Sequence, residues 1–444
     1  MEKIYIKTHG CSTNFSESEV MAGVLEKNGF RIVDEPESAD LIIVNVCTVK
    51  GEVKGLRTIR KMKENYPSKK LIVAGCITKK LIPEIRKISE EASLISTHNI
   101  MDIKEVVEEA LNENPVEDLG KGKEIELKIN KPKKRINPFI GIVPISSGCN
   151  QYCAYCSVIM IKGKLINYPE DIIIKEVEKC VSDGCKEIWI TSQDNGNYGL
   201  DKIGKNEADI KGKLKLPELL RKVIGVNGDF IVRIGMMNPT FLKEMIPEMI
   251  EIFRHKKVFK FLHVPVQSGS DEILRKMDRN YNVDDFKKII EEFRKAIPEL
   301  TLITDIIVGF PGETEEQFQE SIRLIKEVRP DALNISRYKE REGTKANRYG
   351  EKVEGGLIKE RSLKMTQIYE YIAYEQNKKW KNWEGIIFID EKGREGTNTM
   401  IGRNYAYKPV IMLGDHKIGE KIKVRIKDVT KYDLRGEIIS YTEQ

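Results

Sequence analysis

The sequence lacks a long hydrophobic run: no apolar segment reaches the roughly 18 residues that a membrane-spanning helix requires. It also lacks the hydrophobic core of a signal peptide, because residues 1–6 open directly into a strand-like run. We therefore expect a cytoplasmic protein with no membrane contact.

Cysteine and histidine are both scarce, with 8 cysteines and 5 histidines in 444 residues. So few cysteines in so long a chain do not form a disulfide scaffold, and in a reducing cytosol they indicate metal ligation. The histidines show no ligand spacing. The cysteines are therefore the candidate metal ligands.

Excess positive charge is concentrated near the end of the chain. The net charge is +6, and residues 376–444 carry 14 Lys and Arg against 10 Asp and Glu. A second basic run occupies residues 131–135. Such patches favour nucleic acid through phosphate contacts, although a solvated linker has the same composition.

Three cysteines follow one another in the pattern CxxxCxxC: Cys149, Cys153 and Cys156. Iron–sulfur clusters take thiolate ligands, and three ligands on a cubane cluster leave the fourth iron open. An open iron can bind the amine and carboxylate of S-adenosylmethionine (SAM), and this loop resembles the signature of the radical SAM enzymes. The alternatives are a structural metal loop and three buried cysteines that happen to lie close together.

Three further cysteines lie in residues 1–115, where strand-like and helix-like runs alternate as in a doubly wound α/β domain. Cys11, Cys47 and Cys76 each stand just past the end of an expected strand. Because the carboxyl ends of parallel strands open on one edge of the sheet, the three thiols are expected to meet there. We interpret them as a second cluster site, and the alternative is three unrelated core cysteines.

Residues 116–138 are polar and rich in lysine, and they are expected to link two domains. Residues 139–375 then repeat a strand–helix unit about six times and end in a long helix, which predicts a partial (β/α)6 barrel. Strands are expected at residues 140–146, 187–191, 230–235, 258–264, 302–308 and 332–337, and polar or glycine-rich loops follow the first five of them. The carboxyl ends of barrel strands are where active sites form.

Residues 376–444 change to short strands with turns between them, and four strands are expected there. Lys421, Lys423, Arg425 and Lys427 alternate with apolar residues, which places four cations on one face. A small all-β barrel with this face is a candidate RNA-binding module, and an ordinary solvated strand shares the pattern.

Over nearly the whole chain the sequence resembles the radical SAM methylthiotransferases. The resemblance rests on the order of the three parts, with a TRAM-like barrel last, and on local runs at residues 9–14, 75–76, 305–314 and 402–404. Residues 233–239 and 193–199 look most like the archaeal and eukaryotic branch, which adds a methylthio group to C2 of N6-threonylcarbamoyladenosine beside the tRNA anticodon. One departure is the loop at residues 338–344, which lacks both prolines of the Tyr-x-Pro-Arg-Pro-Gly-Thr run found in many members.

The resemblance implies two [4Fe-4S] clusters, with SAM as radical source and methyl donor. The candidate residues for contacting SAM are Gln193, Arg233, Gln267, Gly309 and Glu313. The implied partners are the tRNA anticodon loop, an electron donor such as ferredoxin or flavodoxin, and a sulfur source. The alternatives are methylthiolation of another tRNA adenosine or of a ribosomal protein side chain, and a non-enzymatic iron–sulfur redox sensor that binds RNA.

Overall fold

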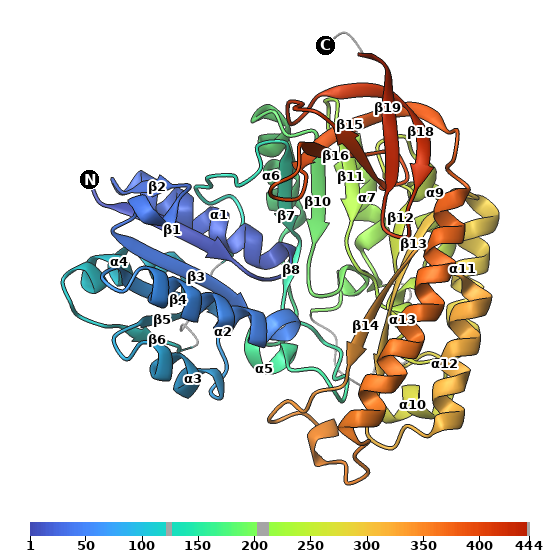
Figure 1. Ribbon diagram of the computed structural model, residues 1–444, viewed down its shortest axis with the longest axis horizontal. Helices are drawn as coiled ribbons and strands as arrows, with labels where there is room; N and C mark the ends of the chain where they lie inside the picture. The colour runs from blue at the N-terminus through green and yellow to red at the C-terminus, as the bar shows by residue number, and fades with distance from the viewer. Residues whose placement is uncertain (121–126, 202–212, 442–444) are drawn as a thin grey trace.

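The computed structural model describes residues 1–120, 127–201 and 213–441 and has the three parts that the sequence predicts (Figure 1). An N-terminal α/β domain lies beside a central parallel barrel, and a small β-barrel completes the fold. None of the described helices is long and apolar enough to cross a membrane.

The N-terminal domain is a six-stranded parallel sheet with helices on both faces. Its strands, in spatial order, are β2 (Arg31–Val33), β1 (Lys3–Thr8), β3 (Leu41–Cys47), β4 (Lys70–Cys76), β5 (Ser93–Ser96) and β6 (Glu117–Asp118). One face packs on α1 (Ser12–Lys27) and α4 (Ile103–Leu111), and the other on α2 (Thr48–Asn65) and α3 (Leu81–Ile88). Every residue of β3 is buried, as expected for a strand covered on both sides. The doubly wound prediction is confirmed.

The central part is a partial barrel of six parallel strands. They run in the order β7 (Ile140–Pro144), β10 (Glu187–Thr191), β11 (Ile231–Ile234), β12 (Phe261–His263), β13 (Thr301–Val308) and β14 (Ala332–Arg337). The longer helices are α6 (Glu170–Ser182), α7 (Leu216–Gly225), α9 (Ile246–Arg254), α11 (Val283–Ala296), α12 (Glu315–Val328) and α13 (Gly355–Lys378). Their apolar sides and the strands form one large core. A short helix, α5 (Val158–Lys162), directly follows the CxxxCxxC loop.

The connector between these two parts is docked rather than solvated where the structure describes it. Three of its cations form ion pairs with carboxylates: Lys133–Glu176, Lys134–Glu26 and Arg135–Asp183. The positive charge of residues 131–135 is therefore largely neutralised within the protein, and this run does not offer the free cations that its sequence suggests.

The C-terminal part is a closed five-stranded barrel. Its strands are β15 (Glu384–Lys392), β16 (Thr399–Arg403), β17 (Pro409–Leu413), β19 (Leu434–Tyr441) and β18 (Lys421–Val429), in spatial order. The expectation of four strands was wrong because β16 was missed. Of its two inward positions, Met400 is apolar but Gly402 has no side chain, and a Cβ atom there would lie 2.7 Å from Ile387 Cδ1, so the apolar alternation of this short strand is broken.

This β-barrel packs against the amino ends of the central strands. Lys421 pairs with Asp229 just before β11 at 2.8 Å, and Lys260 N donates to Tyr405 O just before β12. The CxxxCxxC loop follows β7 and thus lies at the opposite, carboxyl end of the central barrel (Figure 1). A partner held by the β-barrel must extend along the central strands to reach that loop.

Candidate functional site

Cys11, Cys47 and Cys76 come together at the carboxyl edge of the N-terminal sheet. Cys47 ends β3 and Cys76 ends β4, and the two residues pair in register. Cys11 follows β1 and is the N-cap of α1. The Cys47 thiol hydrogen bonds to the sulfurs of both other cysteines. Strand topology therefore collects three thiols that are far apart in the chain.

Glycine permits this close approach at Gly75. Its φ is +103°, and a Cβ atom there would lie 2.2 Å from Asn45 Oδ1. Asn45 in turn donates to the main-chain oxygen of Asn14 at 2.9 Å, and Asn14 Oδ1 accepts from Cys11 N at 3.4 Å. A side chain at Gly75 would push against the amides that position Cys11 and Cys76.

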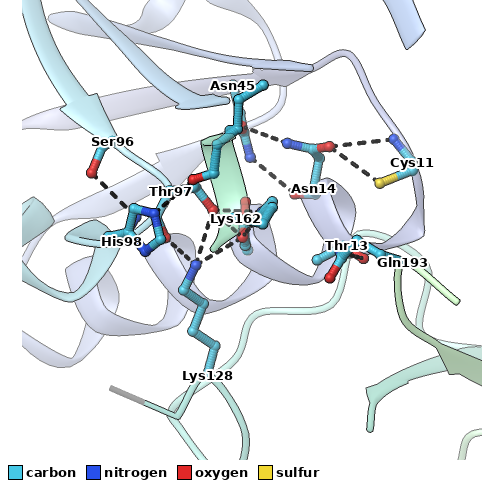
Figure 2. A network of polar contacts seen from close by, with 12 residues as sticks. Cys11, Thr13, Asn14, Asn45, Ser96, Thr97, His98, Lys128, Lys162 and Gln193 are labelled. Carbon is cyan, nitrogen blue, oxygen red and sulfur yellow. Dashed lines mark hydrogen bonds and ion pairs between the residues drawn. The ribbon is translucent and has the colours of Figure 1, made fainter. Parts of the chain in front are cut away.

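A buried cationic network lies between the N-terminal domain and α5 (Figure 2). Lys162 Nζ on α5 is 2.6 Å from Glu17 Oε1 and 2.5 Å from Thr97 Oγ1. Lys128 Nζ is 2.9 Å from the same Glu17 oxygen. The residues of this network share no spacing along the chain that would have predicted it, and the one available signal was the position of Lys162 shortly after Cys156.

Hydrogen bonds and these cations set the protonation of the site. The hydrogen bond from Cys47 lowers the pKa of Cys11 to about 5, and Lys162 acts in the same direction. The contact of Cys76 with Cys47 likewise lowers the pKa of Cys76, whereas the pKa of Cys47 itself is raised by the two contacts. Burial alone would raise the pKa of Glu17, but Lys128 and Lys162 outweigh it and bring the pKa to about 2. Cys11 and Cys76 therefore have thiolate character, the form that binds metal.

Cys149, Cys153 and Cys156 form the second set of thiols in the loop after β7. Each sulfur accepts at least one N–H group: Gln151 N to Cys149 at 3.3 Å, Arg279 Nη1 to Cys153 at 3.2 Å, and Val158 N to Cys156 at 3.5 Å. Gly148 before them has φ +76°, and a Cβ atom there would lie 2.1 Å from Lys164 O. Hydrogen bonds to sulfur are one of the means by which proteins tune iron–sulfur clusters.

Burial gives Cys149 and Cys156 a different protonation from Cys11 and Cys76. It raises the pKa of Cys149, and it raises that of Cys156 to about 11. In the described residues no three His, Cys, Asp or Glu side chains surround a point suited to a single metal ion. The ligands of a cubane cluster stand around four irons and are spread further apart. The all-sulfur donors and their N–H partners fit such a cluster.

The five candidates for contacting SAM have different surroundings. Gln193 Nε2 reaches Thr13 Oγ1 on α1 at 3.5 Å, and its Oε1 has no hydrogen bond among the described residues. Gln267 is buried, with φ +72°, and its main chain bonds to β13. The Arg233 guanidinium lies over aromatic rings, including that of Tyr407 from the C-terminal barrel.

Gly309 and Glu313 form one closed loop. Glu313 Oε2 accepts from Gly309 N at 2.7 Å and pairs with the buried Arg361 of α13 at 3.0 Å. Burial raises the pKa of Glu313 to about 7. The Gly309 N–H group and the Glu313 carboxylate thus both have hydrogen-bond partners within the protein.

The loop at residues 338–344 is fixed although it lacks prolines. The ring of Tyr338 packs edge-on against Phe310 at 5.5 Å between centroids, and Arg341 Nη1 donates to Ser157 Oγ at 3.3 Å. Just beyond it, Ala346 N donates to Ala154 O within the CxxxCxxC loop at 2.8 Å. Contacts with the cysteine loop thus replace the rigidity that proline would supply.

A three-cysteine loop at the carboxyl end of an open six-stranded parallel barrel defines the class: this is a radical SAM enzyme. Residues 143–325 match the radical SAM superfamily, residues 3–97 the uncharacterized protein family UPF0004, and residues 387–439 the TRAM domain. A solved radical SAM methyltransferase, TsrM from Kitasatospora setae, has the same fold with a TM-score of 0.53 at 13% identity, covering 78% of this chain and 77% of that one.

Curated relatives indicate which kind of radical SAM enzyme this chain is. The probable threonylcarbamoyladenosine tRNA methylthiotransferase of Pyrococcus horikoshii is 38% identical over 99% of this chain and 100% of its own length. The threonylcarbamoyladenosine tRNA methylthiotransferase of Drosophila melanogaster is 34% identical over 99% of this chain and 78% of its own length. The chain belongs to the threonylcarbamoyladenosine tRNA methylthiotransferase family. It is therefore a radical SAM tRNA methylthiotransferase, a class whose cofactors are an iron–sulfur cluster and SAM.

Proposed function

We propose that this enzyme adds a methylthio group to C2 of N6-threonylcarbamoyladenosine, next to the tRNA anticodon, and that it uses two [4Fe-4S] clusters. The observation that carries the proposal is the presence of two all-cysteine sites, one in each domain, joined by the buried contacts of Lys162 with Glu17. Relatives that match along their full length are named as probable threonylcarbamoyladenosine tRNA methylthiotransferases, which supports this nucleoside as the substrate.

In this proposal Cys149, Cys153 and Cys156 hold the cluster that binds SAM, and Cys11, Cys47 and Cys76 hold the second cluster. When bound, the first cluster and SAM supply radical chemistry at an inert carbon, and the second supplies sulfur. An external electron donor of the ferredoxin or flavodoxin kind and a sulfur source complete the reaction.

The protein's own side chains position these groups. Arg279 donates to Cys153 and is itself held by Asn238 Oδ1 at 3.0 Å. The Oε1 atom of Gln193 is free for a ligand. Gln193 contacts α1 through Thr13, which lies two residues beyond Cys11. We assign Gln193 and Gln267 to SAM contacts in preference to Glu313, whose carboxylate pairs with Arg361. Arg233 ranks below them because its guanidinium lies over aromatic rings at the C-terminal barrel, although its Nε has no hydrogen-bond partner.

The C-terminal barrel holds tRNA at a distance from the chemistry. Its four cations on β18 share one face as predicted, but Lys421, Arg425 and Lys427 pair with carboxylates. A second RNA contact nearer the cysteines is therefore required.

Helix α2 offers that contact. Lys54, Arg57 and Lys61 are exposed on it, and no ion pair of theirs occurs within the described chain. On the same helix Thr58 hydrogen bonds to His9, which stands two residues before Cys11. Cations at this spacing suit successive phosphates of an RNA strand.

The test is mass spectrometry of modified nucleosides in tRNA from cells with and without the gene. We expect loss of 2-methylthio-N6-threonylcarbamoyladenosine and accumulation of its unthiolated precursor. An unchanged nucleoside profile would overturn the proposal. Accumulation of a different unthiolated adenosine would instead move the activity to that nucleoside.

A further inference from the structure

Arg233 lies on the inner face of the central barrel. Its neighbours on β11, Val232 and Ile234, are buried in the core that the outer helices cover, so Arg233 points to the opposite side, into the barrel. The guanidinium lies over the ring of Trp189 on β10, 4.9 Å from its centroid, and over that of Phe261 on β12, at 4.8 Å. Rings from the two flanking strands thus hold it in place.

The Arg233 guanidinium has aromatic contacts but no acceptor. Its Nε atom is buried without a hydrogen-bond partner, and no ion pair of Arg233 occurs within the part of the chain that the structure describes. The neighbouring carboxylate of Glu187 accepts from the Trp189 indole N–H instead, and burial raises the pKa of Glu187, which favours its neutral form. A buried cation that donates to no acceptor is costly, so an anionic ligand is expected at this position.

The C-terminal barrel closes the lumen beneath Arg233. Tyr407 packs edge-on against Phe259 and Phe261, with 4.8 Å between ring centroids in both pairs, and the Arg233 guanidinium lies 5.2 Å from the Tyr407 ring. This aromatic floor lies at the amino end of the central strands. An anion that reaches Arg233 therefore enters from the carboxyl end, where the CxxxCxxC loop lies.

Arg233 lies a short way down the lumen from that loop. Gly235, two residues further along the chain, packs closely on Asn195, since a Cβ atom there would lie 2.4 Å from Asn195 Nδ2. In the same turn Asn197 Nδ2 donates to Cys149 Sγ at 3.8 Å. Two residues of a strand span about 6.6 Å. A ligand that reacts beside the cysteine loop can thus extend to Arg233.

We propose that Arg233 binds the carboxylate of the threonylcarbamoyl group and so selects adenosine that already carries this group. The inference rests on the proposed function, because this carboxylate is the one anionic group on the base of that nucleoside. With C2 of the adenine beside the cysteine loop, the substituent on N6 extends down the lumen. The aromatic rings cover the faces of the guanidinium and leave its edge for the carboxylate.

The test compares two forms of one tRNA with the reconstituted full-length enzyme. The target adenosine carries the threonylcarbamoyl group either as the free acid or as the neutral methylamide. Methylthiolation is measured by mass spectrometry as kcat/KM, alongside SAM cleavage and tRNA affinity. Arg233→Gln and Arg233→Lys are compared with wild type. Arg403→Gln is the matched control, because Arg403 lies over the same Tyr407 ring at 4.9 Å but pairs with Asp390 at 3.0 Å.

We expect wild type to prefer the acid over the methylamide by roughly a hundredfold, because the amide leaves the buried cation without an anion. Arg233→Gln should lower kcat/KM for the acid by a similar factor and abolish the preference. Arg233→Lys should reduce the preference several-fold, since it keeps the charge but loses the fork of donors. Arg403→Gln should keep the preference. Equal kcat/KM for acid and methylamide in wild type would overturn the proposal, and so would an undiminished preference in Arg233→Gln.

If Arg233→Gln does not fold, Arg233→Lys decides. A reduced preference for the acid there supports the proposal, and an unchanged preference refutes it. Failure of the proposed function is seen separately, because wild type would then cleave SAM but leave the acid form of the tRNA without a methylthio group. In that case the assignment of Arg233 falls with it.

Discussion

The guanidinium of Arg279 donates a hydrogen bond to Cys153 Sγ across 3.2 Å, although 126 positions separate the two residues. Arg279 is fully buried, and its other N–H groups bond to Asn238, Pro265 and Tyr281. The central barrel therefore places a fixed positive charge next to a sulfur of the CxxxCxxC loop.

Replacing Arg279 with methionine should make the loop cluster harder to reduce. Positive charge and N–H donation to a ligating sulfur favour the reduced, more negative state. Arg279→Lys should have a smaller effect, because it keeps the charge but loses the fork of donors. A redox titration followed by electron paramagnetic resonance measures the midpoint potential, which should fall in the order wild type, Lys, Met. Equal potentials in all three would contradict this role.

Serine at Cys153 should abolish SAM cleavage and leave tRNA affinity largely intact, since the loop lies far from the C-terminal barrel. The measurement is 5′-deoxyadenosine released after reduction with SAM, alongside a tRNA binding curve. Cys180→Ser is the control, because Cys180 is buried but belongs to neither set of thiols. Cleavage retained in Cys153→Ser would refute the assignment.

The Cys47→Ser substitution should distinguish the roles of the two cysteine sites. Cys47 hydrogen bonds to both other N-terminal thiols, so its loss should reduce iron from about eight to about four per chain. SAM cleavage should persist while methylthiolated product disappears. Iron and sulfide analysis after anaerobic reconstitution measures the first effect. A wild type with only about four irons would exclude the second cluster.

Glutamine at Lys54, Arg57 and Lys61 together should weaken tRNA binding by roughly ten- to a hundredfold and lower the salt dependence of affinity. The matched control removes Arg323 and Lys326, two exposed cations on α12 at the outer face of the barrel. Binding is measured at several salt concentrations. If tRNA binding is unchanged but reduction by the electron donor slows, α2 instead binds an acidic protein.

The buried carboxylate of Glu17 should make the free energy of unfolding decrease at acid pH. Its pKa is lowered from 4.5 to about 2 in the folded protein, so its contribution is present above about pH 4.5 and is lost as pH falls toward 2. The shift corresponds to about 3 kcal/mol. Glu17→Gln should therefore lower the melting temperature of the cluster-free protein at pH 7 and do so much less at pH 3. A difference that does not shrink with acid would contradict the network.

Much of the fold could be predicted because its signals are local. The run 41–46 predicted a buried strand, and the expected strand at residues 187–191 matches β10. Strand β16 was missed because it is short and Gly402 leaves Met400 as its one buried apolar side chain, which is too little for an apolar alternation. The ion pairs of the connector could not be predicted, because lysine is usually exposed, whereas Lys133 has a buried carboxylate partner on α6.

The sequence by itself determined the class of chemistry. The cysteine spacing at 149–156 and the family runs indicate the cofactor class, because the type and spacing of the ligands are set within a few neighbouring residues. Only the tertiary structure decided the environment of that chemistry. The buried network joins side chains that are far apart in the sequence: Lys162, Glu17, Thr97 and Lys128. Arg279 likewise reaches Cys153 from a distant loop. Such contacts depend on how strands and domains pack, and residues brought together by packing carry no common spacing along the chain.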